Sequence, residues 1–225
     1  MKTLSMLFRR ANRVLQNEGL ISLLRRAFTI VVGWFFQYRT YYLYEQALGD
    51  IRKLNEANYI PKIDNYTFKV ISNNQEADDL EAAGLEFRSH VPNARKRLDK
   101  GAIAFCIFVG QELAHIGWVA LTQQAKDTLP EPPYKLDFLS KEACGSDTWT
   151  NRKYRRRGLR SCSVFKRYEF MLNNGIMISR SAIAKKNIAS QKGRAKFSPR
   201  IYAEGRYLKI LWWKFWKEEP ITPHE

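Results

Sequence analysis

Tyr154-Arg155-Arg156-Arg157-Gly158-Leu159-Arg160-Ser161 is a basic stretch with a single glycine, and it opens a run of helical character from Cys162 to Leu172. The first N–H groups of a helix have no partner within it, and the macrodipole adds partial positive charge at that end. Arginine adds donors in a fork that matches phosphate oxygens. The stretch therefore predicts a loop that binds the phosphate groups of a cofactor at a helix N-terminus.

The composition points to the same kind of ligand. The chain has 225 residues, enough to bury a sizeable core, and its hydrophobic content of 45% excludes global disorder. Residues 152–217 hold nineteen Lys or Arg and two Asp or Glu, so this part alone exceeds the net charge of +16 of the whole chain. Such a surface suits an anionic partner, whether a nucleotide-like cofactor, a nucleic acid or an acidic membrane face.

The cysteines and histidines give no sign of a metal site. Cys106, Cys144 and Cys162 are odd in number, lie far apart and form no C-x-x-C pattern, and the three histidines are equally scattered. There is also no signal-peptide pattern with a small-residue cleavage site. We therefore expect free thiols in a reducing cytoplasm and no bound metal.

Residues 1–60 differ from the rest and are predicted to form an amphipathic helical extension. Apolar residues recur at helical spacing from Leu4 to Leu15, with arginines between them. A second apolar run ends at Phe36 and is followed by several tyrosines, but its uninterrupted core is about half of the 20 residues that span a bilayer. Three interpretations stay open: contact with a membrane surface, packing on the protein's own core or on a second subunit as in a homodimer, and a true span.

Residues 61–225 are predicted to form one mixed domain. Gly110-Gln111 is expected to join two strands as a tight hairpin, and Asn173-Asn174-Gly175 is expected to end the helix after the basic loop. The expected strands are 66–71, 102–109, 112–121, about 147–150, 176–184 and strands within 200–216, and the expected helices are 73–84, 93–99, 162–172 and 188–196.

The order of these elements resembles that of the GNAT superfamily, the acetyl-CoA-dependent N-acyltransferases, over about Tyr66 to Trp216. The family's pyrophosphate loop reads Gln/Arg-x-x-Gly-x-Gly/Ala and often follows a Tyr, and the stretch from Tyr154 to Arg160 matches it except at Arg160. The resemblance implies an α/β (α+β) fold, with a mixed, mostly antiparallel central sheet flanked by helices.

A second motif supports the resemblance, and two positions depart from it. Asn187 with Ser190 fits the Asn at the end of the next strand and the small residue three positions on. The tyrosine that often serves as general acid falls at Arg194, and the usual Lys-x-Gly-Phe falls on 196–199. Arg160, in place of a small residue, either points outward to the 3′-phosphate of the cofactor or marks a degraded loop.

The resemblance implies acetyl-CoA as cofactor. The main-chain groups of Thr148, Trp149 and Thr150 would pair with its pantetheine arm, as an added strand would. Asn187 would bind that arm or position a water, unless it is an ordinary turn residue. The residues implied in the pyrophosphate site are Arg155, Arg156, Arg157, Gly158, Leu159, Arg160 and Ser161, with Ser190 nearby.

The chemistry implied is direct acetyl transfer to a primary amine of a small molecule or of an envelope or sugar precursor. It requires a base, for which Asp147 and Glu112 are candidates, and an acid, for which Tyr202 is a candidate. The alternative interpretation of each carboxylate, as an ordinary surface group, is the one that the sequence favours. The tail from Trp212 to Trp216 mixes Trp and Lys, which suits either a peripheral site on the inner membrane face or a buried aromatic strand.

Two other hypotheses stay open. The basic residues, with Tyr and Trp for stacking, could track the phosphates of a nucleic acid, although no helix-turn-helix, zinc-finger or RNP motif is present. The imperfect loop and the missing tyrosine also fit a non-catalytic, membrane-associated relative of the fold. Saturable binding of acetyl-CoA at one site would favour the enzyme, and a steep fall of affinity with salt would favour the nucleic-acid binder.

Overall fold

The computed structural model describes residues 35–221, and the side chain of Asp147 lies outside this description. The strands form an eight-stranded sheet in the order β2-β3-β4-β5-β6-β1-β7-β8. The strands are β1 (Phe36–Ala47), β2 (Tyr66–Ile71), β3 (Ile103–Val109), β4 (Glu112–Ala120), β5 (Glu142–Thr150), β6 (Ile178–Ala184), β7 (Arg200–Ile210) and β8 (Trp213–Pro220). The α-helices are α2 (Asn74–Ala82), α3 (Ala94–Asp99), α4 (Gln123–Lys126), α5 (Leu159–Asn173) and α6 (Ile188–Ala195), and the short 3₁₀ helices are η1 (Leu48–Lys53), η2 (Glu56–Tyr59), η3 (Arg88–His90) and η4 (Arg152–Tyr154).

The chain divides into two compact units. One consists of Met1–Arg39 with Arg206–Lys217, and the other of Thr40–Gly205 with Glu218–Glu225. The second unit contains the basic loop, most of the sheet and all five α-helices named above, so the site is described within it.

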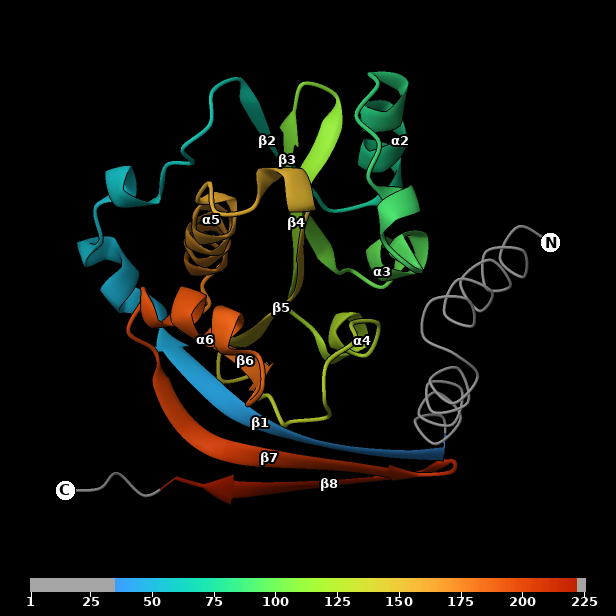
Figure 1. The fold of residues 1–225 in the computed structure, drawn as a ribbon, viewed down its shortest axis with the longest axis vertical. Coiled ribbons are helices and arrows are strands. Elements are labelled where there is room, and N and C mark those ends of the chain that lie inside the picture. Colours follow the sequence, from blue (N-terminus) through green and yellow to red (C-terminus); the bar gives the residue numbers. More distant parts are fainter. Residues whose placement is uncertain (1–34, 222–225) are drawn as a thin grey trace, which may run out of the picture. The chain divides into compact units, whose positions relative to one another are not determined.

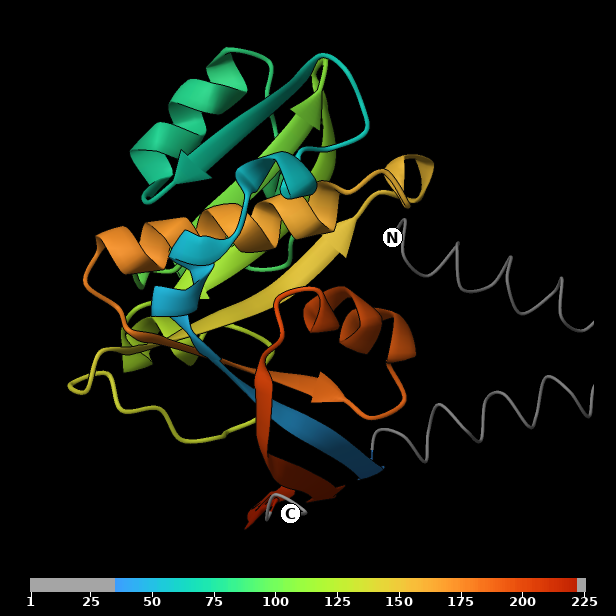
Figure 2. The ribbon, with the colours of Figure 1, turned by 90° about the vertical axis from the view of Figure 1, so that its left-hand side faces the viewer.

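The predicted fold class is confirmed. The pairs β2–β3, β3–β4, β4–β5 and β1–β6 are antiparallel, and β5 pairs parallel with β6. Figure 1 shows α5 on one face of this sheet and α2 and α3 on the other, and Figure 2 shows α5 crossing the strands at an angle. In the core between α5 and the sheet, Val164, Phe165 and Tyr168 of the helix pack with Phe105 and Val119 of the strands.

The aromatic stretch after residue 35 is a strand and not part of a helical extension, which corrects the prediction for this segment. Strand β1 pairs antiparallel with β6, with Leu43 opposite Ala182. Tyr and Phe pack well on a pleated surface, and a neighbouring strand offers them partners that helical spacing alone does not reveal. Leu43 and Tyr44 are buried in this arrangement. The amphipathic helix predicted from Leu4 to Leu15 lies outside the described residues.

A glycine lies close to each end of helix α5. Gly158 precedes it in the left-handed region, with φ of 80°, and Gly175 follows it with φ of 77°. The helix therefore starts three residues earlier than predicted, directly after the basic loop. Within residues 35–221, no helix has the length and apolar character that crossing a membrane requires.

Candidate functional site

Strands β5 and β6 separate soon after they meet. Their parallel ladder joins Glu142–Cys144 to Ile178–Arg180 and goes no further. The register of β5 against β4 also shifts near Trp118, and such irregularities bend a strand. Between the separated strands lies a cavity of about 190 Å³, which we call the inner cavity. It is lined by Glu131, Gly145, Ser146, Thr148, Arg160, Val164, Arg167, Ser181, Ala182, Ile183, Ala184, Asn187, Ser190, Gly193 and Arg194.

A second hollow of about 540 Å³, which we call the outer groove, runs from the end of β5 to the start of α5. It shares Thr148, Arg160, Ser190 and Gly193 with the inner cavity, so the two hollows adjoin. Its remaining lining residues are Trp149, Thr150, Tyr154, Arg155, Arg156, Gly158, Leu159, Ser161, Ala189 and Lys196. The structure thus gathers the predicted cofactor residues around one groove, except Arg157, which lines neither hollow, and Asn187, which lines the inner cavity.

The backbone of the loop explains its glycine. Gly158 is the N-cap residue of α5 and no side chain caps the helix there, so the first N–H groups of α5 have no partner within the helix. A Cβ on Gly158 would lie 3.6 Å from the Ile60 carbonyl oxygen, which is an ordinary contact. The left-handed φ, rather than lack of room, therefore requires glycine here. The main-chain N–H of Lys62 donates to the Arg157 carbonyl at 2.8 Å and holds the loop from behind.

Glu112 lies at the base of this loop and lines neither hollow. Its carboxylate accepts hydrogen bonds from the Tyr154 hydroxyl at 2.6 Å, Lys153 Nζ at 2.7 Å and Asn151 Nδ2 at 2.9 Å. These bonds, first those from Lys153 and Tyr154, lower the pKa of the Glu112 carboxyl. The geometry makes Glu112 an anchor for Tyr154 at the start of the loop.

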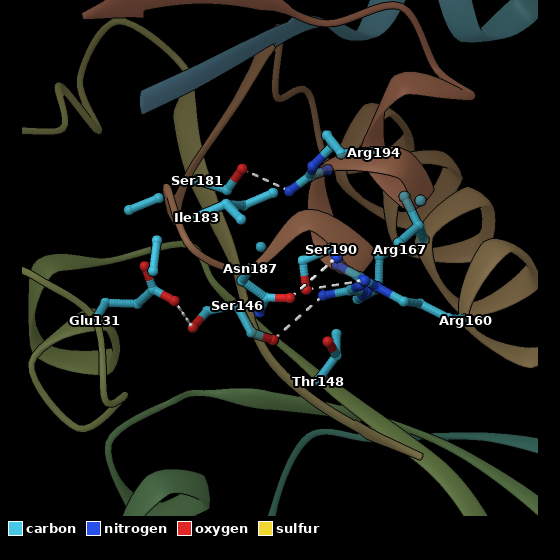
Figure 3. Close-up of a pocket in the computed structure, with 15 residues that line it drawn as sticks. Glu131, Ser146, Thr148, Arg160, Arg167, Ser181, Ile183, Asn187, Ser190 and Arg194 are labelled. Carbon is cyan, nitrogen blue, oxygen red and sulfur yellow. Dashed lines mark hydrogen bonds between the residues drawn. The ribbon is translucent and has the colours of Figure 1, made fainter. Parts of the chain in front are cut away.

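Arg160 points inward from the first turn of α5, as Figure 3 shows. Its Nη1 donates to Ser190 Oγ at 3.1 Å, which places the guanidinium between the groove and the inner cavity. The expectation that Arg160 points outward is wrong, because its guanidinium lies inside the molecule beside Ser190. Burial, and then the neighbouring Arg194, lower the pKa of Arg160 to about 10.

Arg194 and Arg167 complete a group of three arginines around the inner cavity. Arg194, from α6, is buried and donates through Nη2 to Ser181 Oγ at 2.6 Å and through Nη1 to the Tyr168 hydroxyl. It occupies the position at which the resemblance expects a tyrosine.

Arg167 lies two turns after Arg160 on α5 and is 3% exposed. Its Nη1 donates to the main-chain oxygens of Trp118 at 3.2 Å and Ser146 at 3.3 Å. Burial, followed by the charges of Arg194 and Arg160, lowers the pKa of Arg167 to about 9.

A buried histidine lies close to these arginines. His115 Nδ1 is 2.8 Å from Thr150 Oγ1, and its Nε2 has no hydrogen-bond partner among the described residues. Burial and the charges of Arg167 and Arg160 hold the pKa of His115 well below its usual range. The imidazole is therefore neutral at physiological pH.

Glu131 faces the arginines from the opposite side of the inner cavity in Figure 3. It lies in the loop between α4 and β5 and accepts a hydrogen bond from Ser146 Oγ. Asn187 is the N-cap of α6, where its Oδ1 accepts from the main-chain N–H of Ser190 at 3.1 Å. Asn187 thus acts as a capping residue that also lines the cavity.

The other two predicted catalytic residues are placed as follows. Asp147 belongs to β5, and its side chain lies outside the described part of the structure. Tyr202 lies on β7 with the Arg180 guanidinium 4.5 Å from its ring centroid, and it lines neither hollow. Burial raises the pKa of Tyr202.

Sequence reasoning missed Glu131, Arg167 and Arg194 as site residues. One signal was present, because Arg160 and Arg167 are seven residues apart and so share a helix face. Among the described residues, no group of three or more His, Cys, Asp or Glu is arranged to hold a metal ion.

The architecture is GNAT-like: a mostly antiparallel sheet flanked by helices, one parallel pair that separates, and a helix that starts at a glycine loop between the strands of that pair. Neither a protein-family model nor a curated protein matches the chain. Several solved structures do resemble it in fold.

One is a tandem GNAT protein from the clavulanic acid biosynthesis pathway, at 16% identity and a TM-score of 0.49, covering 89% of this chain and 59% of that one. A second is a GCN5-related glucosamine N-acetyltransferase region of a fungal multi-domain GH3 β-N-acetylglucosaminidase. It has 11% sequence identity and a TM-score of 0.49, and the match covers 88% of this chain and 23% of that one. A third is a GCN5-related N-acetyltransferase-like protein from Streptococcus suis. It has 14% sequence identity and a TM-score of 0.48, and the match covers 87% of this chain and 69% of that one. The chain spans less than two thirds of the length of the first two proteins. At these sequence identities the similarity concerns the fold alone.

Proposed function

We propose that the protein is an acyl-CoA-dependent N-acyltransferase that binds CoA in the outer groove. The observation that carries this proposal is the uncapped start of α5 at Gly158, which opens onto a groove adjoining the gap between two separating strands. The chemistry of the groove fits the cofactor, because its wall combines unpaired N–H groups with the guanidinium groups of Arg155 and Arg156.

The main-chain N–H groups from Arg156 to Ser161 would hold the diphosphate. The edge of β5 from Thr148 to Thr150 is the natural partner for the amide-bearing arm, because β6 pairs with β5 only as far as Cys144. When bound, acyl-CoA would supply a thioester carbonyl as acyl donor. The inner cavity would then receive the groups next to that carbonyl.

Glu131 is the residue placed to receive the proton of a primary amine acceptor. Of the described side chains that line the inner cavity, only Glu131 carries a carboxylate, and its hydrogen bond from Ser146 fixes the orientation of one oxygen. An amine attacks only in its neutral form, so a carboxylate at the acceptor's position serves as general base. We accordingly favour Glu131 over Glu112, which lines neither the inner cavity nor the outer groove.

The test is calorimetric titration with CoA, run beside a thiol-release assay with acetyl-CoA and a panel of primary amines. Gly158→Asp places a carboxylate where the diphosphate would lie and strains the left-handed backbone, so we expect CoA affinity to fall by a factor on the order of 100. Gly101→Asp is the matched control, since Gly101 also has φ of 80° and has nothing within 4 Å of an added Cβ.

Unchanged CoA affinity in the folded Gly158→Asp variant would reject the groove as the cofactor site. CoA binding without thiol release for any amine would instead indicate a non-catalytic relative of the fold. Absence of CoA binding, with nucleic-acid binding that weakens steeply as salt rises, would favour the nucleic-acid hypothesis.

A membrane-surface role for the unit that contains Arg206–Lys217 is a second proposal. The turn between β7 and β8 exposes a group of aromatic side chains, with Trp212 76% and Trp213 59% exposed, and Lys209 and Lys214 lie among them. Trp and Lys mixed in this way suit the headgroup region of a bilayer. An envelope precursor carrying an amine would be an acceptor available at such a surface.

A further inference from the structure

The inner cavity carries an excess of buried positive charge. Among the described side chains that line it are three guanidinium groups, from Arg160, Arg167 and Arg194, and one carboxylate, that of Glu131. The hydrogen-bond partners of the three arginines are hydroxyl groups and main-chain oxygens. Among the side chains that the structure describes, no carboxylate forms an ion pair with any of them.

This arrangement is unfavourable in the absence of an anion. Removing like charges from water and placing them together without a counter-charge opposes folding. The lowered pKa values of Arg160 and Arg167 reflect the same burial and mutual repulsion. A bound anion would supply the missing charge, and the protein would hold the donors in place before it arrives.

The arginines also keep donors for such an anion. A guanidinium has five N–H donors, and Arg160 uses only Nη1, toward Ser190, among the described residues. Arg167 has its Nε and Nη1 engaged, and among the described residues its Nη2 has no acceptor. Planar forks of this kind match the two oxygens of a carboxylate.

We propose that the inner cavity binds a carboxylate carried by one of the two substrates, held by Arg160, Arg167 and Arg194. The choice between substrates rests on the proposed acyltransferase function, whereas the carboxylate site itself does not. A cavity of about 190 Å³ is slightly larger than one of ~150 Å³ that holds benzene, so it suits a short arm of a few atoms. The carboxylate therefore belongs either to a dicarboxylic acyl group on CoA or to a small amine acceptor such as an amino acid.

The first experiment uses the full chain and free dicarboxylate, without CoA. Thermal shift and calorimetry with succinate, with its neutral analogue succinamide and with inorganic phosphate are compared for the wild type, Arg160→Gln and Arg194→Gln. Arg152→Gln is the matched control, because it removes the same charge from an exposed residue that lines neither hollow. Of the three compounds, we expect only succinate to stabilise the wild type and the control. The affinity for succinate should fall about tenfold or more in both cavity variants.

Equal responses to succinate and succinamide, tighter binding of phosphate than of succinate, or unchanged succinate affinity in both cavity variants would overturn the inference. Arg160→Gln should remain folded, because one hydrogen bond to Ser190 is all it loses among the described residues. Circular dichroism checks that the variant is folded, and Arg194→Gln provides a second, independent test of the same site.

The second experiment identifies which substrate carries the carboxylate. If succinyl-CoA binds about tenfold or more tightly than acetyl-CoA, and Arg160→Gln removes the difference, the acyl donor carries it. If the two bind equally while succinate or glutamate still binds the CoA-loaded protein, the acceptor carries it. Succinate binding without any CoA binding would leave the cavity site standing and reject the acyltransferase function, so the two failures are distinguishable.

Discussion

At the scale of single residues, the site departs from its resemblance at two arginines that meet in space. Arg160 stands where a small residue is usual, and Arg194 stands where a tyrosine is usual. Both line the inner cavity, on either side of Arg167 in sequence. The two departures thus form one feature, a cationic cavity, rather than two separate losses. The sequence revealed both departures but gave no sign that the side chains converge, because only the fold places Ser190 and Arg194 of α6 within hydrogen-bond distance of α5.

Glu131→Gln tests the assignment of the general base. The change keeps the shape of the side chain but removes its ability to accept a proton, so we expect thiol release from acetyl-CoA to slow by about 10² to 10⁴. CoA affinity, measured by calorimetry, should stay unchanged because Glu131 lies outside the outer groove.

Asp147→Asn and Glu112→Gln are the matching comparisons, since these were the bases that the sequence suggested. Each should retain turnover within about tenfold of the wild type, far above the loss expected for a general base. If Asp147→Asn abolishes thiol release while Glu131→Gln does not, the proton acceptor is Asp147 and our assignment is wrong.

At the scale of elements, α5 approaches the sheet closely over β4, and a glycine makes this possible. A Cβ on Gly117 would lie 3.1 Å from Arg167 Cζ and 3.2 Å from Thr148 Cγ2. Arg167 cannot move away easily, because its guanidinium is bonded to two main-chain oxygens. We expect Gly117→Ala to lower the free energy of unfolding by about 1 to 3 kcal/mol, measured by urea denaturation.

Gly49→Ala is the control for this change. Gly49 lies in η1 with nothing within 4 Å of an added Cβ and no left-handed φ, so alanine should stabilise the protein by about 0.4 to 1 kcal/mol. Equal midpoints for Gly117→Ala and the wild type would show that α5 can shift, and that Arg167 is not held as tightly as its hydrogen bonds indicate.

Local patterns predicted most of the elements, and the exceptions have a common cause. The β3–β4 hairpin and the basic loop before α5 carry their own turn residues, so the sequence locates them. Strand β1 was missed because its partner strands in the sheet, β6 and β7, are both more than 130 residues away in sequence. Glu131 was missed for the same reason, since only the fold brings the loop after α4 beside β5 and opposite the arginines.

At the scale of the whole molecule, net charge and exposed aromatic residues act together. The chain carries +16, mostly within residues 152–217, and this excess attracts any polyanion at low salt. Charge alone therefore does not distinguish CoA, a nucleic acid and an anionic membrane. Apolar insertion does, because it adds a contribution to membrane binding that salt does not screen.

The full chain should co-sediment with vesicles that contain anionic phospholipid, and part of this binding should survive at high salt. Trp212→Ser combined with Trp213→Ser removes two exposed side chains, so we expect binding to fall about tenfold or more. Leu139→Ser combined with Met177→Ser is the matched control, because both residues are exposed and apolar but lie outside the unit that contains the β7–β8 turn. Retention of binding in the tryptophan variant, or binding that salt abolishes completely, would show that charge alone holds the protein to the vesicle and that the aromatic turn does not enter the bilayer.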